Sequence, residues 1–118
     1  MLVQSALTER VIGLAIDVHK ALGPGLLESV YETCLCLELR HAGILFRRQV
    51  PMPVTYRGTR LETGYRTDLI VADQVIVEIK AVERLSPAHE AQALAYLRMS
   101  DCQMVLLLNF NAPASRMA

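Results

Sequence analysis

The chain has 118 residues, of which 53% are apolar, and its 12 basic and 12 acidic residues give a formal net charge of zero. Such a length fits one globular domain, and such a composition excludes an intrinsically disordered chain. No apolar run approaches the roughly 20 residues of a membrane span. The first ten residues lack the basic start and apolar stretch of a signal peptide. We therefore expect one domain over residues 1–118, in the cytoplasm and not in a membrane.

The charge is uneven along the chain. The segment from Arg40 to Arg66 contains six arginines and one acidic residue, a net charge of +5, so the remainder carries −5. A phosphate-binding surface needs such a basic segment, although an ordinary solvated strand has the same composition. The cysteines (Cys34, Cys36 and Cys102) are odd in number and lie in apolar segments. Free buried thiols are therefore expected, rather than disulfides or a zinc site.

Two helices are expected first. Apolar residues recur at three- and four-residue steps from about Ser5 to Leu22, which predicts an amphipathic helix. Gly23-Pro24-Gly25 ends this helix with a sharp connection. A second helix is expected from about Leu27 to His41, with Gly43 as its C-terminal cap.

Three strands are expected next. They cover Ile44–Tyr56, Arg60–Val71 and Gln74–Lys80, where β-branched and aromatic residues are frequent. Pro51 and Pro53 indicate that the first is an edge strand or is bent.

A third helix and a fourth strand complete the pattern. Ser86 is a good N-cap and Pro87 a good first helical residue, for a helix that runs to about Ser100. The continuous apolar run Cys102–Leu108 indicates a central strand, and residues 109–118 are expected to form a short, poorly ordered tail. The order ααβββαβ predicts an α/β fold in which helices flank both faces of a four-stranded mixed sheet.

The second and third strands bring charged side chains together. If their turn centres on Asp73, Asp68 lies opposite Glu78, with the two Cβ atoms about 5 Å apart. Lys80 shares this face because strand side chains alternate with period two. One hairpin thus gathers two carboxylates and an ammonium group.

This grouping suggests a metal site. Two carboxylates on an apolar hairpin are costly to bury without a cation, and Mg²⁺ or Mn²⁺ prefers oxygen ligands. The backbone carbonyl of Ile79 would add another oxygen. A bound metal would polarise a phosphoryl group and activate a water, while Lys80 would orient that water or neutralise charge on phosphorus. The alternative is an ordinary ion pair on a solvated strand face, since Asp-x₉-Glu-x-Lys occurs often by chance.

Polar residues on two helices extend the candidate site. Gln92 and Tyr96 are four residues apart and share a helix face, and His89 lies on nearly the same stripe. The stripe suggests contact with a polar ligand, or else it is the wet side of an amphipathic helix. Glu28 lies in the first turn of the second helix, where capping and the helix dipole would also explain a carboxylate.

Together these segments have a recognisable pattern. Gly25-Leu-Leu-Glu28-Ser-Val-Tyr31 resembles the signature of the GxxExxY family, a branch of the PD-(D/E)XK nuclease superfamily. The resemblance runs from about Val11 to Asn111 and also includes His19-Lys-Ala-Leu-Gly-Pro-Gly-Leu-Leu-Glu28, Arg48-Gln-Val-Pro-Met-Pro-Val54, Gly64-Tyr-Arg-Thr-Asp68, Val77-Glu-Ile-Lys80, His89-Glu-Ala-Gln92 and Leu108-Asn-Phe-Asn111. Residues 112–118 do not continue the pattern, which agrees with a loose tail.

The resemblance implies a metal-dependent nuclease, and superfamily habit favours DNA over RNA as substrate. The implied metal ligands are Asp68, Glu78 and the Ile79 carbonyl, with Glu28 as a further acidic ligand, direct or through water. Lys80 would be the catalytic lysine, acting with Asp68, Glu78 and Glu28. The implied substrate-binding residues are Gln92 and Tyr96, and Arg48 and Arg66 would flank them.

Other functions stay open. The same residues would suit a nuclease-like module that binds nucleic acid or a protein partner without cutting. Because specific protein–DNA interfaces commonly bury over about 1,000 Å², a domain of this size favours a homodimer or a partner protein. Exonuclease or endonuclease action, strand preference and pathway are not predicted.

Overall fold

The protein's structure, a computed structural model, describes residues 3–117. In chain order the elements are α1 (Val3–Leu22), α2 (Glu28–His41), β1 (Phe46–Pro51), β2 (Val54–Tyr56), β3 (Thr59–Leu61), β4 (Arg66–Val71), β5 (Val75–Lys80), α3 (Pro87–Met99), β6 (Met104–Asn109) and the 3₁₀ helix η1 (Ala114–Arg116). The α/β class and the three predicted helices are confirmed. Since residues 1, 2 and 118 lie outside the described range, one domain over residues 1–118 stays a prediction.

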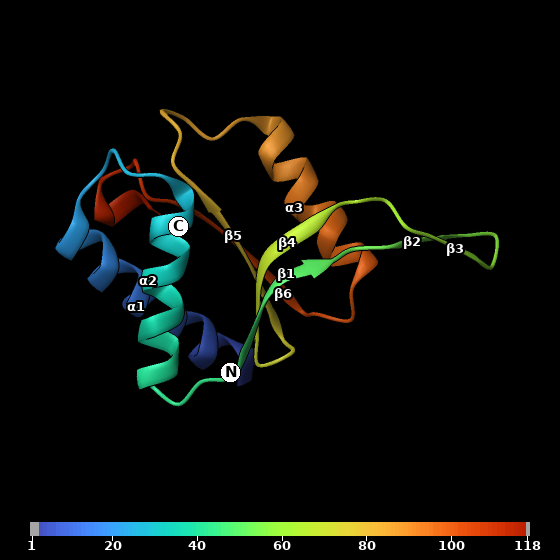
Figure 1. The fold of residues 1–118 in the computed structure, drawn as a ribbon, viewed down its shortest axis with the longest axis horizontal. Helices are drawn as coiled ribbons and strands as arrows, with labels where there is room; N and C mark the ends of the chain where they lie inside the picture. Colours follow the sequence, from blue (N-terminus) through green and yellow to red (C-terminus); the bar gives the residue numbers. More distant parts are fainter. Residues whose placement is uncertain (1–2, 118) are drawn as a thin grey trace.

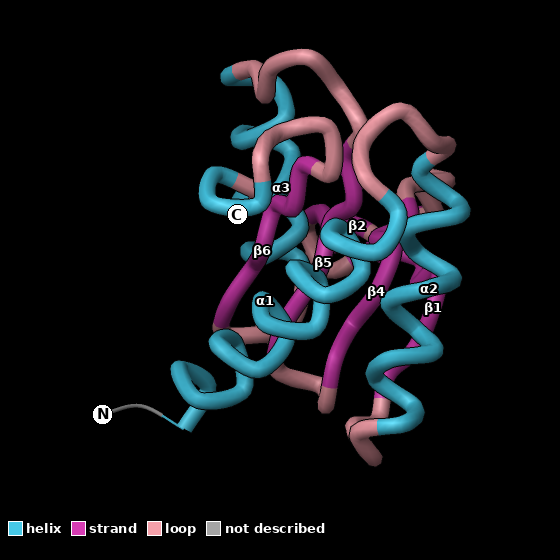
Figure 2. The backbone as a smooth tube through the Cα atoms, turned by 90° about the vertical axis from the view of Figure 1, so that its left-hand side faces the viewer, coloured by secondary structure: helices cyan, strands magenta, loops and turns pink. Residues whose placement is uncertain are grey.

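Four strands form one mixed sheet in the spatial order β1-β4-β5-β6, seen side by side in Figure 2. Within residues 3–117, β6 pairs only with β5 and lies at the edge of the sheet, so the central position predicted for the strand Cys102–Leu108 is wrong. β1 and β5 run antiparallel to β4, whereas β6 runs parallel to β5 and is reached through α3. The C-terminal ends of β1, β5 and β6 therefore lie at the same end of the sheet as the start of β4. This end of the sheet carries the candidate site.

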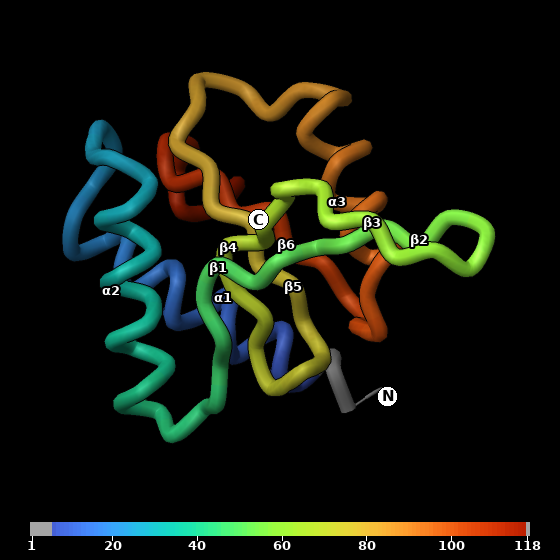
Figure 3. Tube along the Cα trace, turned by 45° about the vertical axis from the view of Figure 1, so that its right-hand side comes forward, coloured from blue at the N-terminus to red at the C-terminus, as the bar shows by residue number. Residues whose placement is uncertain are grey.

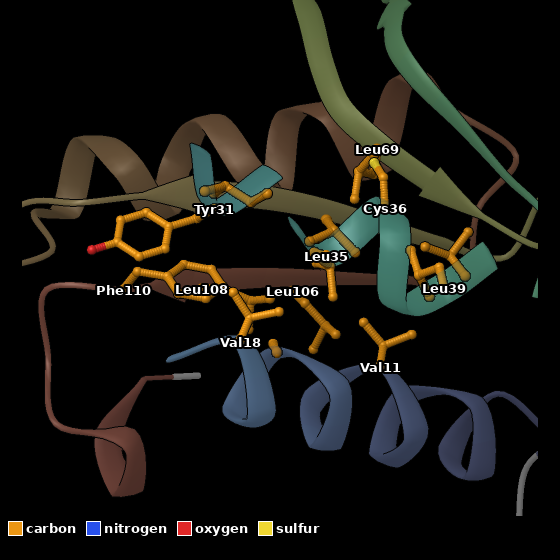
Figure 4. Close-up of a cluster of buried hydrophobic side chains, with 14 of the residues drawn as sticks. Val11, Val18, Tyr31, Leu35, Cys36, Leu39, Leu69, Leu106, Leu108 and Phe110 are labelled. Atoms are coloured by element: carbon orange, nitrogen blue, oxygen red, sulfur yellow. The ribbon is translucent and has the colours of Figure 1, made fainter. Parts of the chain in front are cut away.

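Helices cover both faces of the sheet, as predicted. α1 and α2 pack on one face, and α3 packs on the other (Figure 1). The larger core lies beneath α1 and α2 and includes Val11, Tyr31, Leu35, Leu69, Leu108 and Phe110 (Figure 4). A smaller cluster beneath α3 contains Met52, Ile70, Ile76 and Tyr96. Because Ile70 and Ile76 face α3, the alternation of strand side chains places Asp68, Glu78 and Lys80 on this same face.

Two predicted strands are divided, and their boundaries are corrected here. The segment Ile44–Tyr56 forms β1 and β2, and Arg60–Val71 forms β3 and β4. Between β1 and β2, Met52 turns its side chain into the cluster beneath α3. Pro53 has no N–H to continue a ladder, so the bend predicted from the prolines is confirmed. β2 and β3 pair as a separate two-stranded sheet.

The C-terminal segment is packed, and the predicted loose tail is wrong for residues 109–117. The Asn109 N–H donates to the Met117 carbonyl at 2.7 Å, and the Met117 side chain is buried in the larger core. The His19 ring also bonds the Ala112 carbonyl through Nε2 at 2.6 Å. An apolar side chain that fills the core thus orders a segment for which the sequence predicted no helix or strand. Ala118, which belonged to the same prediction, lies outside the described residues.

In the part of the chain that the structure describes, no helix has the length and apolar character needed to cross a membrane.

Candidate functional site

The two hairpin carboxylates lie where β4 and β5 stop pairing. The ladder ends at Leu69 and Val77, and continuing it by one residue on each strand brings Asp68 opposite Glu78. The ladder itself is replaced there by side-chain contacts. The Ile79 N–H donates to Asp68 Oδ2 at 2.7 Å, and the Asp68 N–H donates to Glu78 Oε1 at 3.3 Å. Both carboxylates are therefore fixed by backbone groups of the facing strand.

Glu78 is the more deeply buried of the two, with 4% of its surface exposed. Its pKa is raised from 4.5 to about 7, chiefly by burial and in part by the negative charge of Asp68, while the Lys80 ammonium acts to lower it. The Thr67 hydroxyl lies close enough to lower this pKa too, yet its geometry does not complete a hydrogen bond. A cation near Glu78 would therefore stabilise the ionised form of this carboxylate.

The α3 helix brings Tyr96 over the hairpin. Tyr96 is buried, and burial raises the pKa of its hydroxyl, as do the negative charges of Glu78 and Asp68. Its ring centroid lies 6.2 Å from that of Tyr65. Gln92, one turn earlier, is half-buried, and no hydrogen bond joins its side chain to the described residues. α3 therefore places Tyr96 beside the hairpin carboxylates.

His89 has a structural position. Its Nδ1 accepts from the Ser86 N–H at 3.1 Å, and its own N–H donates to Ser86 Oγ at 3.2 Å. The two residues close a capping box at the start of α3. Capping therefore accounts for the histidine that shares the polar stripe of this helix.

Glu28 reaches the end of β5 from α2. Its Oε2 accepts from the Ala81 N–H at 2.8 Å, and Ala81 directly follows Lys80. Tyr31 fixes the loop before this glutamate: its hydroxyl donates to the Gly23 carbonyl at 2.6 Å and accepts from the Leu26 N–H at 3.1 Å. The helix start is thereby held beside the last residues of β5.

A second polar network, which the sequence did not predict, adjoins Asp68. Glu32 is 6% exposed, and its Oε2 accepts from Arg48 Nε and Nη2 at 3.0 and 2.8 Å. Gln49 Nε2 donates to Glu32 Oε1 at 2.9 Å and to Asp68 Oδ1 at 3.3 Å. Gln49 therefore links the ion pair of the buried Glu32 and the partly exposed Arg48 to a candidate metal ligand.

The backbone around Gln49 is irregular. Its φ is 49°, and the β1–β4 register passes from the pair Arg48–Leu69 to the pair Val50–Thr67 without it. Non-glycine residues with positive φ are uncommon and often mark functional sites. Two features of the sequence could have indicated this polar network. Glu28 and Glu32 are one helical turn apart on α2, and Gln49 is a polar residue between Arg48 and Val50 in a predicted strand.

The candidate cationic residues have different surroundings. Arg48 is engaged by Glu32, and this hydrogen bond raises the pKa of the guanidinium. Arg66 is exposed and donates from Nη1 to the Gln49 carbonyl at 3.3 Å. Lys80 is half-exposed, next to the chain segment that Glu28 holds. Arg66 and Lys80 are thus better placed than Arg48 to meet an anion.

The donor set fits a divalent cation. Among residues 3–117, no three His, Cys, Asp or Glu side chains converge as a metal cluster. Mg²⁺, however, is commonly held by one or two carboxylates while it keeps several waters. Asp68 and Glu78 supply two carboxylates, and the Ile79 carbonyl points to the same side of β5 as its N–H, which faces Asp68. A cation bound there would offset the burial that raises the pKa of Glu78.

Comparison with known proteins supports a nuclease fold. The sequence model of the PD-(D/E)XK nuclease superfamily matches residues 5–118, nearly the whole chain. No curated protein and no solved structure gave a significant match. The matched range includes the hairpin carboxylates, Lys80 and the packed C-terminal segment. Nucleases of this superfamily generally use divalent metal ions, in agreement with the donor set. The chain therefore belongs to the PD-(D/E)XK nuclease superfamily.

Proposed function

We propose that this protein is a metal-dependent nuclease of the GxxExxY branch that hydrolyses phosphodiester bonds in DNA. The observation that carries the proposal is the pairing of Asp68 with the buried Glu78 where two strands separate, two residues before Lys80. Superfamily membership supports a nucleic-acid substrate, and superfamily habit favours DNA over RNA. A cytoplasmic location and a homodimer stay predictions.

Asp68, Glu78 and the Ile79 carbonyl would hold Mg²⁺ or Mn²⁺. When bound, the ion supplies a polarised phosphoryl oxygen and a water of lowered pKa. The carboxylates are held against backbone N–H groups, so their positions are set before substrate arrives. Glu28 approaches from α2 and would contribute through a water, because its Oε2 is engaged by the Ala81 N–H.

Five other residues would act on the substrate. The Lys80 ammonium would orient the attacking water or offset charge that develops on phosphorus. The pKa of Tyr96 is raised, so its hydroxyl keeps its proton and can donate to a phosphate oxygen. Gln92 would hydrogen-bond a phosphate or the water, since it lies one turn from Tyr96 without a described partner. Arg66 and the free donors of Arg48 would attract the phosphate backbone.

One observation favours a second candidate, a nucleic-acid or protein-binding module that does not cut. Both hairpin carboxylates accept hydrogen bonds from backbone N–H groups and so also maintain the strand geometry. A chain without catalytic activity would therefore still use these two residues to hold the strands in place.

A cleavage assay separates the two candidates. The wild type, Lys80→Ala and Lys20→Ala would be incubated with single- and double-stranded DNA and RNA, with Mg²⁺, Mn²⁺ or a chelator. Lys20 is an exposed residue of α1 and serves as the matched control. We expect metal-dependent DNA cleavage that Lys80→Ala lowers by about 10² or more and Lys20→Ala leaves unchanged. Metal binding without cleavage of any of these substrates would support the binding module instead.

A further inference from the structure

An arm projects from the body of the molecule. β2 and β3 pair only with each other, in the register Val54–Leu61, Thr55–Arg60 and Tyr56–Thr59. Residues 55–61 are all exposed. Figures 1 and 3 show the arm extending away from the sheet and the helices. We refer to residues 54–61 as the β2–β3 arm.

The arm has the physical character of a binding element. A two-stranded hairpin without other packing is marginally stable in water, and both edges of this one are unpaired. Tyr56 is 62% exposed and Leu61 is 46% exposed, so neither large side chain is covered by the body. An occupant would cover apolar surface and order the arm.

The charge of the arm favours an anionic occupant. Its two arginines, Arg57 and Arg60, are balanced by no acidic residue within residues 54–61. Arg57 lies over the Tyr56 ring, with its guanidinium carbon 5.6 Å from the ring centroid. Arg60 pairs with Glu62 beyond the arm, but both groups are exposed, and such pairs hold weakly in water. Both guanidinium groups can therefore turn to phosphates.

The shape of the arm favours one kind of nucleic acid. The major groove of B-form DNA admits a two-stranded β-ribbon, whereas the A-form major groove of double-stranded RNA is too narrow for side chains to read. The arm continues β1 beyond Pro51 and returns into β4 at Arg66, two residues before Asp68. A duplex on the arm would thus run past the end of the sheet that carries the carboxylates.

We propose that the β2–β3 arm is a duplex-binding ribbon, which lies in the major groove of B-form DNA and holds one strand at the Asp68–Glu78 site. This inference rests on the proposed function for the identity of the substrate class. It adds a preference for double-stranded DNA and assigns that preference to Arg57, Arg60 and Tyr56.

Binding measured without cleavage tests the arm separately from catalysis. Full-length Lys80→Ala protein in chelator would be titrated into fluorescent DNA duplex, single-stranded DNA of equal length and RNA duplex, at several salt concentrations. The test variant adds Arg57→Ala and Arg60→Ala. The control adds Arg10→Ala and Arg116→Ala, which remove equal charge from exposed positions on α1 and η1.

We expect the arm variant to lose at least tenfold in affinity for the DNA duplex and to lower the salt slope by about 2, one unit for each phosphate contact. Its affinity for the single strand should change less than threefold, and the control should change less than twofold on every probe. In the Lys80→Ala protein, the further single change Tyr56→Ala should weaken duplex binding several-fold without changing the salt slope.

Several outcomes would overturn the proposal. These are equal losses in the arm variant and the control, equal losses on single strand and duplex, or RNA duplex bound as tightly as DNA duplex. A dimer in light scattering that Tyr56→Ala or Leu61→Ser dissociates, with DNA affinity unchanged, would assign the arm to a second copy of the chain. Arm-dependent duplex binding by a wild type that cuts nothing would keep this inference and reject the proposed nuclease.

Discussion

Two glutamates in this protein are buried to nearly the same extent, and their surroundings are opposite. Glu32 meets the guanidinium of Arg48 through two hydrogen bonds and an amide of Gln49 through a third. Glu78 is opposite another carboxylate, and burial raises its pKa to about 7. A buried acid with a cation partner belongs to the structure. A buried acid beside a second acid lowers the stability of the folded chain, which points to a role in function.

The largest test of this contrast is the pH dependence of folding. The pKa of Glu78 is raised from 4.5 to about 7, so the folded state holds the proton more tightly than the unfolded chain. Its contribution to stability is present below pH 4.5 and falls as pH rises from 4.5 through 7, by on the order of 3 kcal/mol in metal-free protein. We expect Glu78→Gln to remove this part of the slope and to be more stable than the wild type at pH 8.

Urea unfolding in chelator from pH 5 to 8 measures this slope, and Glu32→Gln serves as the comparison at the paired site. Saturating Mn²⁺ should flatten the slope of the wild type, because the ion stabilises the ionised carboxylate. Parallel profiles for the wild type and Glu78→Gln would show that burial does not disfavour this charge.

The paired glutamate should respond to loss of its cation. Arg48→Ala leaves the Glu32 carboxylate buried without a counter-charge. We expect a loss of about 2 kcal/mol in the free energy of unfolding, below the usual cost for fully buried pairs because the Arg48 side chain is 41% exposed. Arg47→Ala is the matched control, since Arg47 pairs with Asp73 at the surface and should cost less than about 1 kcal/mol. Equal losses for the two substitutions in urea unfolding would show that the Arg48–Glu32 pair contributes no more to stability than the surface pair Arg47–Asp73.

Metal affinity tests the unpaired side of the comparison. We expect the wild type to bind one Mn²⁺ in the micromolar to millimolar range and Asp68→Asn to bind it at least about tenfold more weakly. Asp73→Asn, a change in the exposed turn of the same hairpin, should leave the affinity unchanged. Calorimetric titration gives both constants, and equal Mn²⁺ binding by the wild type and Asp68→Asn would disprove the assigned ligand.

The smallest expected effect concerns the link between the two regions. Gln49→Ala removes the amide that joins Glu32 to Asp68. Since the Asp68 contact is 3.3 Å and the carboxylate keeps its bond from the Ile79 N–H, we expect Mn²⁺ affinity to fall only several-fold. Gln49→Glu, which places an acid beside Glu32, should weaken folding more than Gln49→Ala. Unchanged metal affinity in Gln49→Ala would separate the two networks.

The sequence predicted what depends on local spacing. Helix periodicity located α1, α2 and α3, and a turn centred on Asp73 was enough to set Asp68 opposite Glu78. It did not predict contacts that close only in three dimensions. Glu32 resembled an ordinary helix surface residue because its partners, Arg48 and Gln49, lie on a strand whose position over α2 is set by the sheet order. The positive φ of Gln49 has no local sequence signal.

The same limit applies to the C-terminal segment. The burial of Met117 depends on contacts with α1 and β6, which are distant in the sequence and are not indicated by the neighbouring residues. The division of the predicted strands was partly readable, because Pro51 and Pro53 indicated the bend. The separation of the β2–β3 arm from the main sheet was not readable from the prolines.

The position of Tyr31 affects how signature sequences of this kind are used to identify enzymes. Its hydroxyl holds the Gly23–Leu26 loop, and its ring stacks on Phe110 at 4.6 Å. Neither contact involves a reacting group. A genome search for Gly-x-x-Glu-x-x-Tyr would therefore collect chains that share this loop anchor, whether or not they retain the hairpin carboxylates. Under the proposed function, Asp68, Glu78 and Lys80 are the positions that would separate active proteins from inactive ones, whereas Tyr31 reports only on the scaffold.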